Sequence, residues 1–168
     1  VVFVDDGSTD ASWARLSEFA GSDQRIIAVR LRKNSGKAIA YAAGFREARG
    51  DILATLDADL QDDPAELPKL IERLEGDVHT RCDVVVGWKE HRQDPIIKVW
   101  SSRIYNALLR RVSGTQLHDQ NSGIRVLRRE VISAIPLRGD LYRMIPALAA
   151  MSGFRIAEVP VHHRPRMH

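Results

Sequence analysis

The alternation of short apolar runs with longer helical patterns over the first 90 residues constrains the fold more than any other feature. The apolar runs end in turn residues, which is typical of buried strands. Strands are predicted at 1–4, 25–31, 51–56 and 82–87, and helices between them at 11–20, 36–49 and 64–75. This order is the βαβ signature of a mainly parallel sheet with helices on both faces. We therefore predict an α/β fold.

The second half of the chain follows with less regular spacing. Helices are predicted at 96–112, 129–135 and 141–151, and strands at 122–127 and 154–159. A chain of 168 residues is long enough to bury a real core, so we predict a single domain over residues 1–168. Because the first apolar run already begins at Val1 and the chain stops without a closing signal, we expect a fragment, truncated at both ends.

The composition excludes several classes of protein. Hydrophobic residues make up 44% and charged residues 28%, which is typical of a globular rather than a disordered chain. The net charge of +3 is too mild to indicate a nucleic-acid partner. A single cysteine, Cys82, excludes an internal disulfide and a thiolate metal site. No apolar stretch approaches the roughly 18 residues of a membrane-spanning helix, so we expect any membrane anchor outside this chain.

Acidic side chains follow the third predicted strand, in the segment DADLQDD. Asp57 and Asp59 are two positions apart, so in extended backbone their carboxylates project to the same side. A hard divalent cation with oxygen ligands is well suited to hold two such carboxylates together. Gln61 continues the spacing with a neutral oxygen, and the three residues are the predicted metal site. The acids at 62–63 are expected to be solvated and to cap the following helix.

A second acidic pair, Asp5 and Asp6, closes the first predicted strand. Ligands of open α/β sheets bind beyond the carboxyl ends of the strands, so we expect both acidic clusters to face one pocket there. Carboxylates at this edge can accept hydrogen bonds from ribose hydroxyls or a base N–H. Turn and cap chemistry is the alternative, and the spacing alone leaves both open. The residues at 8–10 are expected to cap the helix that follows.

Cationic groups form weaker patterns. Gly36 and Lys37 start the second helix, where a backbone nest and an ammonium can hold phosphate, although the P-loop pattern is absent. Later basic side chains are Lys89, Arg92, Lys98, Arg103, Arg164 and Arg166. If these side chains lie near a metal site, they indicate that the site binds a second phosphate group. The alternative is that they are ordinary solvent-exposed charges. The histidines at 79, 91 and 118 are expected at the surface, and the tryptophans at 88 and 100 in packing.

Seven segments, taken in order, carry a family resemblance. They are VDDGSTD at 4–10, NSGK at 34–37, GDI at 50–52, LDADLQDDP at 56–64, DVVVGWKEHRQD at 83–94, DQNSGIR at 119–125 and EVPVHHRPR at 158–166. The chain resembles the family 2 glycosyltransferases, and within them the polyprenyl-phosphate (dolichyl-phosphate mannosyltransferase-like) transferases. The resemblance implies a GT-A catalytic domain over residues 1–168, with a Rossmann-like mixed sheet flanked by helices.

The resemblance also implies a role for each matching residue. The implied nucleotide-sugar residues are Asp5, Asp6, Gly36, Lys37, Asp57 and Ala58. The implied ligands of Mg²⁺ or Mn²⁺ are Asp57, Asp59 and Gln61. The implied acceptor-phosphate residues are Lys89, Arg92, Lys98, Ser102 and Arg166. Asp59 and Asp119 are the implied catalytic residues, with Asp119 near the sugar and the acceptor.

The implied reaction is metal-dependent, inverting transfer of a sugar from a nucleotide-diphosphate sugar to a polyprenyl phosphate, at the cytoplasmic face of a membrane. Two departures from the family pattern affect this expectation. Lys89 and Lys98 cannot form the bidentate fork of arginine. The family's first strand and its P-x-[YF]-N-E segment would precede Val1. The alternatives are a family 2 transferase acting on a sugar hydroxyl, a haloacid-dehalogenase-like phosphatase, and a non-catalytic nucleotide-sugar binding module.

Overall fold

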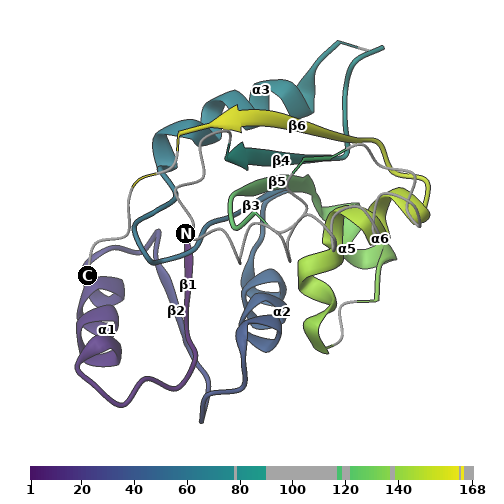
Figure 1. The fold of residues 1–168 in the computed structure, drawn as a ribbon. Helices are drawn as coiled ribbons and strands as arrows, with labels where there is room; N and C mark the ends of the chain where they lie inside the picture. The colour runs from purple at the N-terminus through teal and green to yellow at the C-terminus, as the bar shows by residue number, and fades with distance from the viewer. Residues whose placement is uncertain (78, 90–116, 119–121, 137–138, 163, 165–168) are drawn as a thin grey trace, which may run out of the picture. The chain divides into compact units, whose positions relative to one another are not determined.

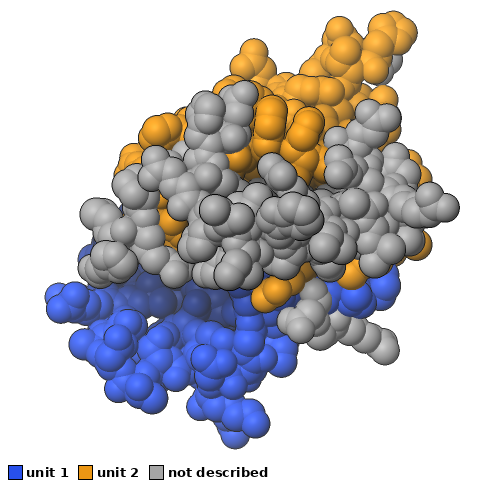
Figure 2. Space-filling model, viewed as in Figure 1, with its two compact units in different colours: residues 1–50, 136–142 blue, residues 51–135, 143–168 orange. Residues whose placement is uncertain are grey.

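The computed structural model describes residues 1–77, 79–89, 117–118, 122–136, 139–162 and 164 (Figure 1). Tertiary contacts gather in two compact units, each of which is described by itself. Unit 1 is formed by residues 1–50 and 136–142, and unit 2 by residues 51–135 and 143–168 (Figure 2). The single catalytic domain expected over residues 1–168 stays a prediction.

Unit 1 is built on a parallel strand pair flanked by two helices. Its elements are β1 (Val2–Asp5), α1 (Ser12–Ser22), β2 (Ile27–Arg30) and α2 (Lys37–Glu47). Successive strand residues point to opposite faces. The ring of Phe3 lies 6.4 Å from that of Phe19 in α1, while Val4 reaches Gly44 in α2. The helices therefore cover opposite faces of the pair, as the βαβ pattern predicts. Helix α2 ends at Glu47, two residues before the end of the helix predicted at 36–49.

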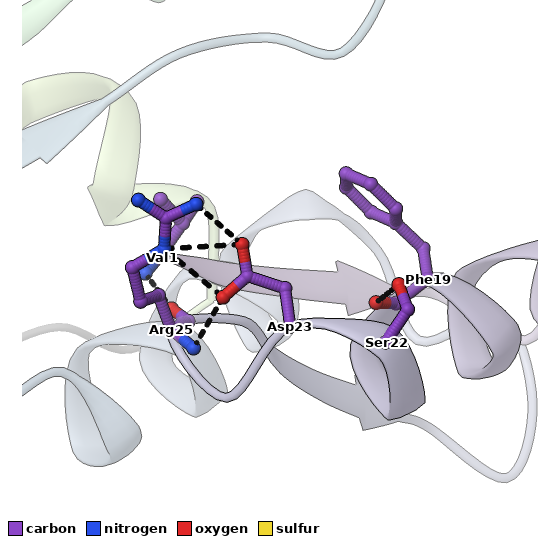
Figure 3. Close-up of polar contacts among 5 residues, drawn as sticks. All are labelled: Val1, Phe19, Ser22, Asp23 and Arg25. Carbon is purple, nitrogen blue, oxygen red and sulfur yellow. Dashed lines mark hydrogen bonds and ion pairs between the residues drawn. The ribbon is translucent and has the colours of Figure 1, made fainter.

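Polar contacts close the turn between α1 and β2 (Figure 3). The Ser22 hydroxyl donates to the Phe19 carbonyl at 2.8 Å, which satisfies an acceptor in the last turn of α1. The guanidinium of Arg25 donates to Asp23, with 2.6 Å between Nη2 and Oδ2, and this bond lowers the pKa of Asp23. The amino group of Val1 donates to the Arg25 carbonyl at 2.5 Å. These bonds start β2 in register beside β1.

Unit 2 contains a four-stranded mixed sheet in the order β3-β5-β4-β6. The strands are β3 (Ile52–Thr55), β4 (Val84–Lys89), β5 (Arg125–Arg128) and β6 (Ile156–Val161). Strand β5 is antiparallel to both of its neighbours, and β4 is parallel to β6. Strands β3, β4 and β6 thus share one direction, as the alternating pattern predicts, and the reversed β5 gives the mixed sheet that the family resemblance implies. The carboxyl ends of β3, β4 and β6 and the amino end of β5 lie at one edge of this sheet.

Helices cover both faces of the unit 2 sheet. The helices of this unit are η1 (Pro64–Glu66), α3 (Leu67–Glu75), α5 (Arg129–Ala134) and α6 (Ile145–Met151). A further short helix, η2 (Gly139–Met144), has residues 139–142 in unit 1 and its last two residues in unit 2. Leu70 and Leu74 of α3 are fully buried and pack in one cluster with Val85 and Val126. Val84, Val85 and Val86 are all inaccessible to solvent, which requires cover on both sides of β4. Within the described residues, no helix has the length and apolar character needed to cross a membrane.

Candidate functional site

The edge of the unit 2 sheet where β3, β4 and β6 end carries the predicted metal residues. The Thr55 hydroxyl donates to the Gly123 carbonyl at 2.9 Å and ties the end of β3 to the residues that lead into β5. Asp57 and Asp59 follow within a few residues, and both are half-buried while Ala58 between them is exposed. The sequence-based placement of these two carboxylates directly after a buried strand is confirmed.

Asp62 differs from its prediction as a solvated cap residue. Its side chain is only 1% exposed, and its Oδ1 lies 3.0 Å from Nζ of Lys89, whose side chain is 11% exposed. Its Oδ2 accepts a long hydrogen bond, 3.4 Å, from the backbone N–H of Asp57. An ionised carboxylate is buried at acceptable cost only with such partners. Asp62 thus links the last residue of β4 to the segment that carries the predicted metal ligands.

Gly123 lies close to the carboxylates of Asp57 and Asp62. A Cβ at this position would lie 2.6 Å from Oδ2 of Asp57 and 2.7 Å from Oδ2 of Asp62. The two carboxylates therefore approach the same backbone carbon, and a side chain there would displace them. Gly123 belongs to the DQNSGIR motif, but its role is not predictable from the sequence, because the pattern does not say which side chains the glycine faces.

The turn that follows Asp59 has a strained residue. Leu60 has a φ of 63°, in the left-handed region that a branched side chain rarely adopts, and it is exposed. The next residue donates its backbone N–H to Oδ1 of Asp59 at 3.2 Å. This bond orients the Asp59 carboxylate, and Gln61, the third predicted metal ligand, is half-buried beside it.

The segment after β6 lies along the same loop. The backbone N–H of Arg164 donates to the Gln61 carbonyl at 2.9 Å, and its guanidinium pairs with Asp63. Lys69 of α3 donates to the Pro160 carbonyl at 2.6 Å. Asp63 also accepts from the Ala65 N–H at 3.0 Å, so its predicted capping role is confirmed. The residues around 160–164 are thereby fastened to the loop that follows Asp59.

Acid should weaken this fastening through Asp63. The N–H of Ala65 and then the Arg164 guanidinium lower the pKa of Asp63 below its usual value. Because the folded pKa is lower than the unfolded one, the stabilisation is complete above about pH 4 and is lost as pH falls through the folded value. We expect the difference in melting temperature between wild type and Asp63→Asn to shrink between about pH 5 and pH 2. Thermal melts across that range measure it, and a constant difference would contradict it.

The acidic pair of unit 1 is held by backbone groups. Asp6 accepts from the N–H groups of Ser35 at 2.7 Å and Gly36 at 2.9 Å. Asp5 is buried, accepts from the Ser8 N–H at 3.3 Å and lies 3.7 Å from the Arg30 guanidinium. Both carboxylates thus organise the turns at the end of β1. Their predicted contact with a nucleotide, and a pocket shared with Asp57 and Asp59, stay predictions.

Gly36 and the residues at 8–10, which were predicted to cap the first helix, have defined contacts near this pair. Gly36 precedes α2, and its N–H is engaged by Asp6, so the predicted phosphate nest at Gly36 and Lys37 would have to share that donor with a ligand. Helix α1 begins at Ser12, too late for the residues at 8–9 to cap it. Asp10 instead accepts from the Ser12 N–H at 2.9 Å, and bonds with Ser12 lower its pKa.

A cluster that sequence analysis missed lies elsewhere in unit 2. The backbone N–H of His118 donates to Glu158 Oε2 at 2.8 Å, and the imidazole pairs with the other carboxylate oxygen. The ring stacks on Trp88, with 4.4 Å between centroids. The surface position expected for His118 is confirmed, since its side chain is 58% exposed. The cluster anchors the residue that directly precedes Asp119.

The donor set at the β3 edge fits a hard divalent cation. Asp57, Asp59 and Gln61 offer oxygen atoms at half-buried positions, which is the chemistry that Mg²⁺ and Mn²⁺ take. Within the ranges that the structure describes, no group of three or more His, Cys, Asp or Glu side chains forms a ready metal cluster. Several predicted site residues lie outside the described residues: Arg92, Lys98, Ser102, Asp119 and Arg166, together with the helix predicted at 96–112.

Comparisons with curated proteins extend over the whole chain. Dodecaprenyl-phosphate galacturonate synthase of Rhizobium johnstonii is 35% identical over 172 residues, which cover 100% of this chain and 50% of the relative. Undecaprenyl-phosphate 4-deoxy-4-formamido-L-arabinose transferase of Pseudomonas fluorescens is 36% identical over 169 residues, covering 100% and 48%. The chain thus spans about half the length of the curated relatives it matches.

Solved structures share the fold at lower identity. The mannosyltransferase PcManGT from Pyrobaculum calidifontis, in complex with GDP-Man and Mn²⁺, aligns with a TM-score of 0.66 and 21% identity, over 95% of this chain and 45% of that one. Glucosyl-3-phosphoglycerate synthase from Mycobacterium tuberculosis, in complex with Mn²⁺, UDP-Glc and PGA, aligns with a TM-score of 0.68 and 22% identity, over 99% and 61%. These likenesses confirm the predicted α/β GT-A fold class with a mixed sheet.

The family assignment rests on a longer match than any single motif. The family described as glycosyl transferase family 2 matches residues 1–135, which include both acidic pairs, the Asp62–Lys89 ion pair and Gly123. The chain belongs to glycosyl transferase family 2.

Proposed function

We propose that this chain is the donor-binding and catalytic part of a metal-dependent glycosyltransferase whose acceptor is a polyprenyl phosphate. The observation that carries the proposal is the match, over the entire chain, to two curated relatives whose names describe sugar transfer to polyprenyl phosphates. The half-buried carboxylates at the end of β3 support it, because a nucleotide diphosphate needs a cation to neutralise its charge.

In this proposal Asp57, Asp59 and Gln61 hold Mg²⁺ or Mn²⁺ together with the donor diphosphate. The cation would stabilise the negative charge that develops on the leaving nucleotide. The backbone N–H of Gln61 donates to the Asp59 carboxylate and orients it. The buried Asp62 accepts from the backbone N–H of Asp57 and holds it in place. Such preorganisation matters because the groups need not reorient when charge develops. Asp5, Asp6, Gly36 and Lys37 would contact the nucleotide.

The transfer step itself needs little proton chemistry. An oxygen of the acceptor phosphate attacks the anomeric carbon, the bond from that carbon to the donor diphosphate breaks, and the configuration inverts. A phosphate is already ionised near neutral pH, so Asp119 would orient the reactants rather than remove a proton. Arg92, Lys98, Ser102 and Arg166 would hold the acceptor phosphate. A lipid acceptor places the reaction at a membrane surface, on the cytoplasmic side where nucleotide sugars are made.

The proposal is tested with the full-length protein, Mn²⁺ or Mg²⁺, radiolabelled nucleotide sugars on UDP and GDP, and undecaprenyl phosphate in detergent. We expect a labelled glycolipid that requires both metal and lipid phosphate. Transfer to a sugar hydroxyl but not to lipid phosphate would overturn the acceptor. Metal-dependent phosphate release from a simple phosphomonoester would favour a phosphatase, and donor binding without turnover would favour a binding module.

Arg166 gives a sharper test of the acceptor assignment. Because the family resemblance assigns it to the acceptor phosphate, Arg166→Ala is expected to raise the KM for lipid phosphate by about tenfold or more, since charge-assisted hydrogen bonds are the strong ones. Donor affinity, measured by calorimetry with Mn²⁺, should change less than about twofold. Arg15→Ala, on α1, is the matched control and should change neither quantity. Equal losses in donor and acceptor affinity would contradict the assignment.

A further inference from the structure

We propose that Asp62 is a positioning residue of the cation site and that Lys89 is its counter-charge, a role distinct from direct binding of metal or substrate. The inference rests on the proposed function, because it concerns the cation that Asp57 and Asp59 would hold. It departs from the roles expected from the sequence, in which Asp62 was a solvated cap residue and Lys89 was a ligand of the acceptor phosphate.

Burial is the first observation that supports it. The side chains of Asp62 and Lys89 are 1% and 11% exposed, and their charged atoms lie 3.0 Å apart. Such burial of two charges is unfavourable unless each compensates the other. Lys69, by comparison, is an exposed lysine whose side chain is 52% accessible and lies 4.0 Å from Glu66. The Asp62–Lys89 pair is therefore a buried ion pair within the fold and not a surface contact.

Connectivity is the second observation. One carboxylate oxygen of Asp62 faces Lys89 at the end of β4, and the other accepts from the Asp57 N–H beyond the end of β3. Gly123, two residues before β5, contacts the carboxylates of both Asp57 and Asp62. Asp62 thus joins three strand ends and sets where Asp57 stands. Groups behind metal ligands orient them in this way, and their removal typically lowers metal affinity by about 10- to 100-fold.

Charge is the third part of the argument. Asp62 and Lys89 together are neutral, so the pair adds no net charge beside Asp57 and Asp59, the predicted metal ligands. Neutralising Asp62 alone would leave the Lys89 ammonium beside these carboxylates, where it would repel the cation and compete for Asp57. Neutralising both members of the pair would restore the balance. Asp62 and Lys89 are therefore predicted to act as one unit toward the metal, which a purely structural residue would not do.

The test measures Mn²⁺ affinity directly, by calorimetry with UDP or GDP present, on the full-length protein. Asp62→Asn is expected to weaken Mn²⁺ binding about 10- to 100-fold. The double variant Asp62→Asn with Lys89→Met should recover to within about threefold of wild type, because asparagine keeps an oxygen that accepts from the Asp57 N–H and the unbalanced positive charge is gone. Asp63→Asn, the neighbouring acid that caps η1, is the matched control and should stay within about twofold, since asparagine also caps helices.

Unchanged affinity in a folded Asp62→Asn variant, or a double variant as weak as the single one, would overturn the inference while leaving the proposed function intact. If Asp62→Asn does not fold, Lys89→Met is compared with the double variant. Lys89→Met, which keeps the Asp62 charge but lacks the ammonium, should then bind Mn²⁺ about tenfold more tightly than the double variant, and equal affinities would overturn the inference. Wild-type protein that binds no Mn²⁺ with either nucleotide would overturn the proposed function, and the inference with it.

Discussion

Asp59→Asn is expected to abolish metal-dependent binding of the nucleotide sugar. The substitution keeps the size of the side chain and an oxygen that can accept from the backbone N–H of Gln61, as Asp59 does at 3.2 Å. It removes one of the two carboxylate charges that would face the cation. Loss of a direct ligand should exceed the roughly 10- to 100-fold cost of losing a supporting residue, so we expect at least about a 100-fold loss of affinity. Calorimetry with UDP- and GDP-sugars, with and without Mn²⁺, measures it.

The control for Asp59 lies in the same loop. Asp63→Asn also removes one negative charge, but from a residue that caps η1 and pairs with Arg164. Its donor affinity should remain within about twofold of wild type at neutral pH, because the lost charge pairs with Arg164 and asparagine can still cap η1. An Asp59→Asn variant that binds donor with unchanged Mn²⁺ dependence would remove Asp59 from the metal site.

Gly7→Ala is expected to cause the largest loss of stability. Gly7 has a φ of 73°, and a Cβ there would lie 2.4 Å from the backbone carbonyl carbon of Lys33 and 2.6 Å from the nitrogen of Asn34. The left-handed conformation costs a residue with a Cβ about 1–2 kcal/mol, and backbone atoms cannot move aside as a flexible side chain can. Together these effects should lower the free energy of unfolding by roughly 3 kcal/mol or more. Urea denaturation followed by circular dichroism measures the loss.

Substitutions at two other glycines separate the cost of the left-handed conformation from the cost of the steric clash. Gly36 has a φ of 88°, but a Cβ there meets nothing within 4 Å, so Gly36→Ala should show the conformational cost of about 1–2 kcal/mol alone. Gly21 lies in α1 in open space, so Gly21→Ala should leave stability unchanged or raise it by up to about 1 kcal/mol. Equal losses at Gly7 and Gly36 would show that the close approach of Lys33 is not a constraint.

The strand and helix pattern was predictable because it follows from local chemistry. Every predicted strand has a counterpart within about two or three residues. The predicted helices inside the described ranges also have counterparts, although the one predicted at 141–151 becomes α-helical only at Ile145, after the 3-10 helix η2. The direction of β5 was not predictable, because an apolar run reads the same whichever way the strand runs in the sheet. The first turn of the helix predicted at 64–75 is the short η1, in which Pro64 follows the capping Asp63.

The candidate site was predictable only in part for a related reason. Asp57 and Asp59 could be placed from sequence since they directly follow a strand. The burial of Asp62 could not, because it depends on Lys89, which is 27 positions away and arrives only when β4 joins the sheet. Adjacent acids in one loop look alike in sequence, yet Asp62 is buried and Asp63 caps a helix. Tertiary pairing, rather than local pattern, separates their roles.

The bare backbone at Gly123 limits how this site can change by mutation. Every single-nucleotide change that replaces a glycine introduces a residue with a Cβ, and at this position the Cβ alone would press on the carboxylates of Asp57 and Asp62. Even alanine, the smallest substitution, would therefore displace the carboxylates of Asp57 and Asp62 from their positions. Substitutions of surface residues can accumulate one by one, whereas any substitution at position 123 disturbs the site at once. A change of metal or donor preference in this chain would have to begin at another residue.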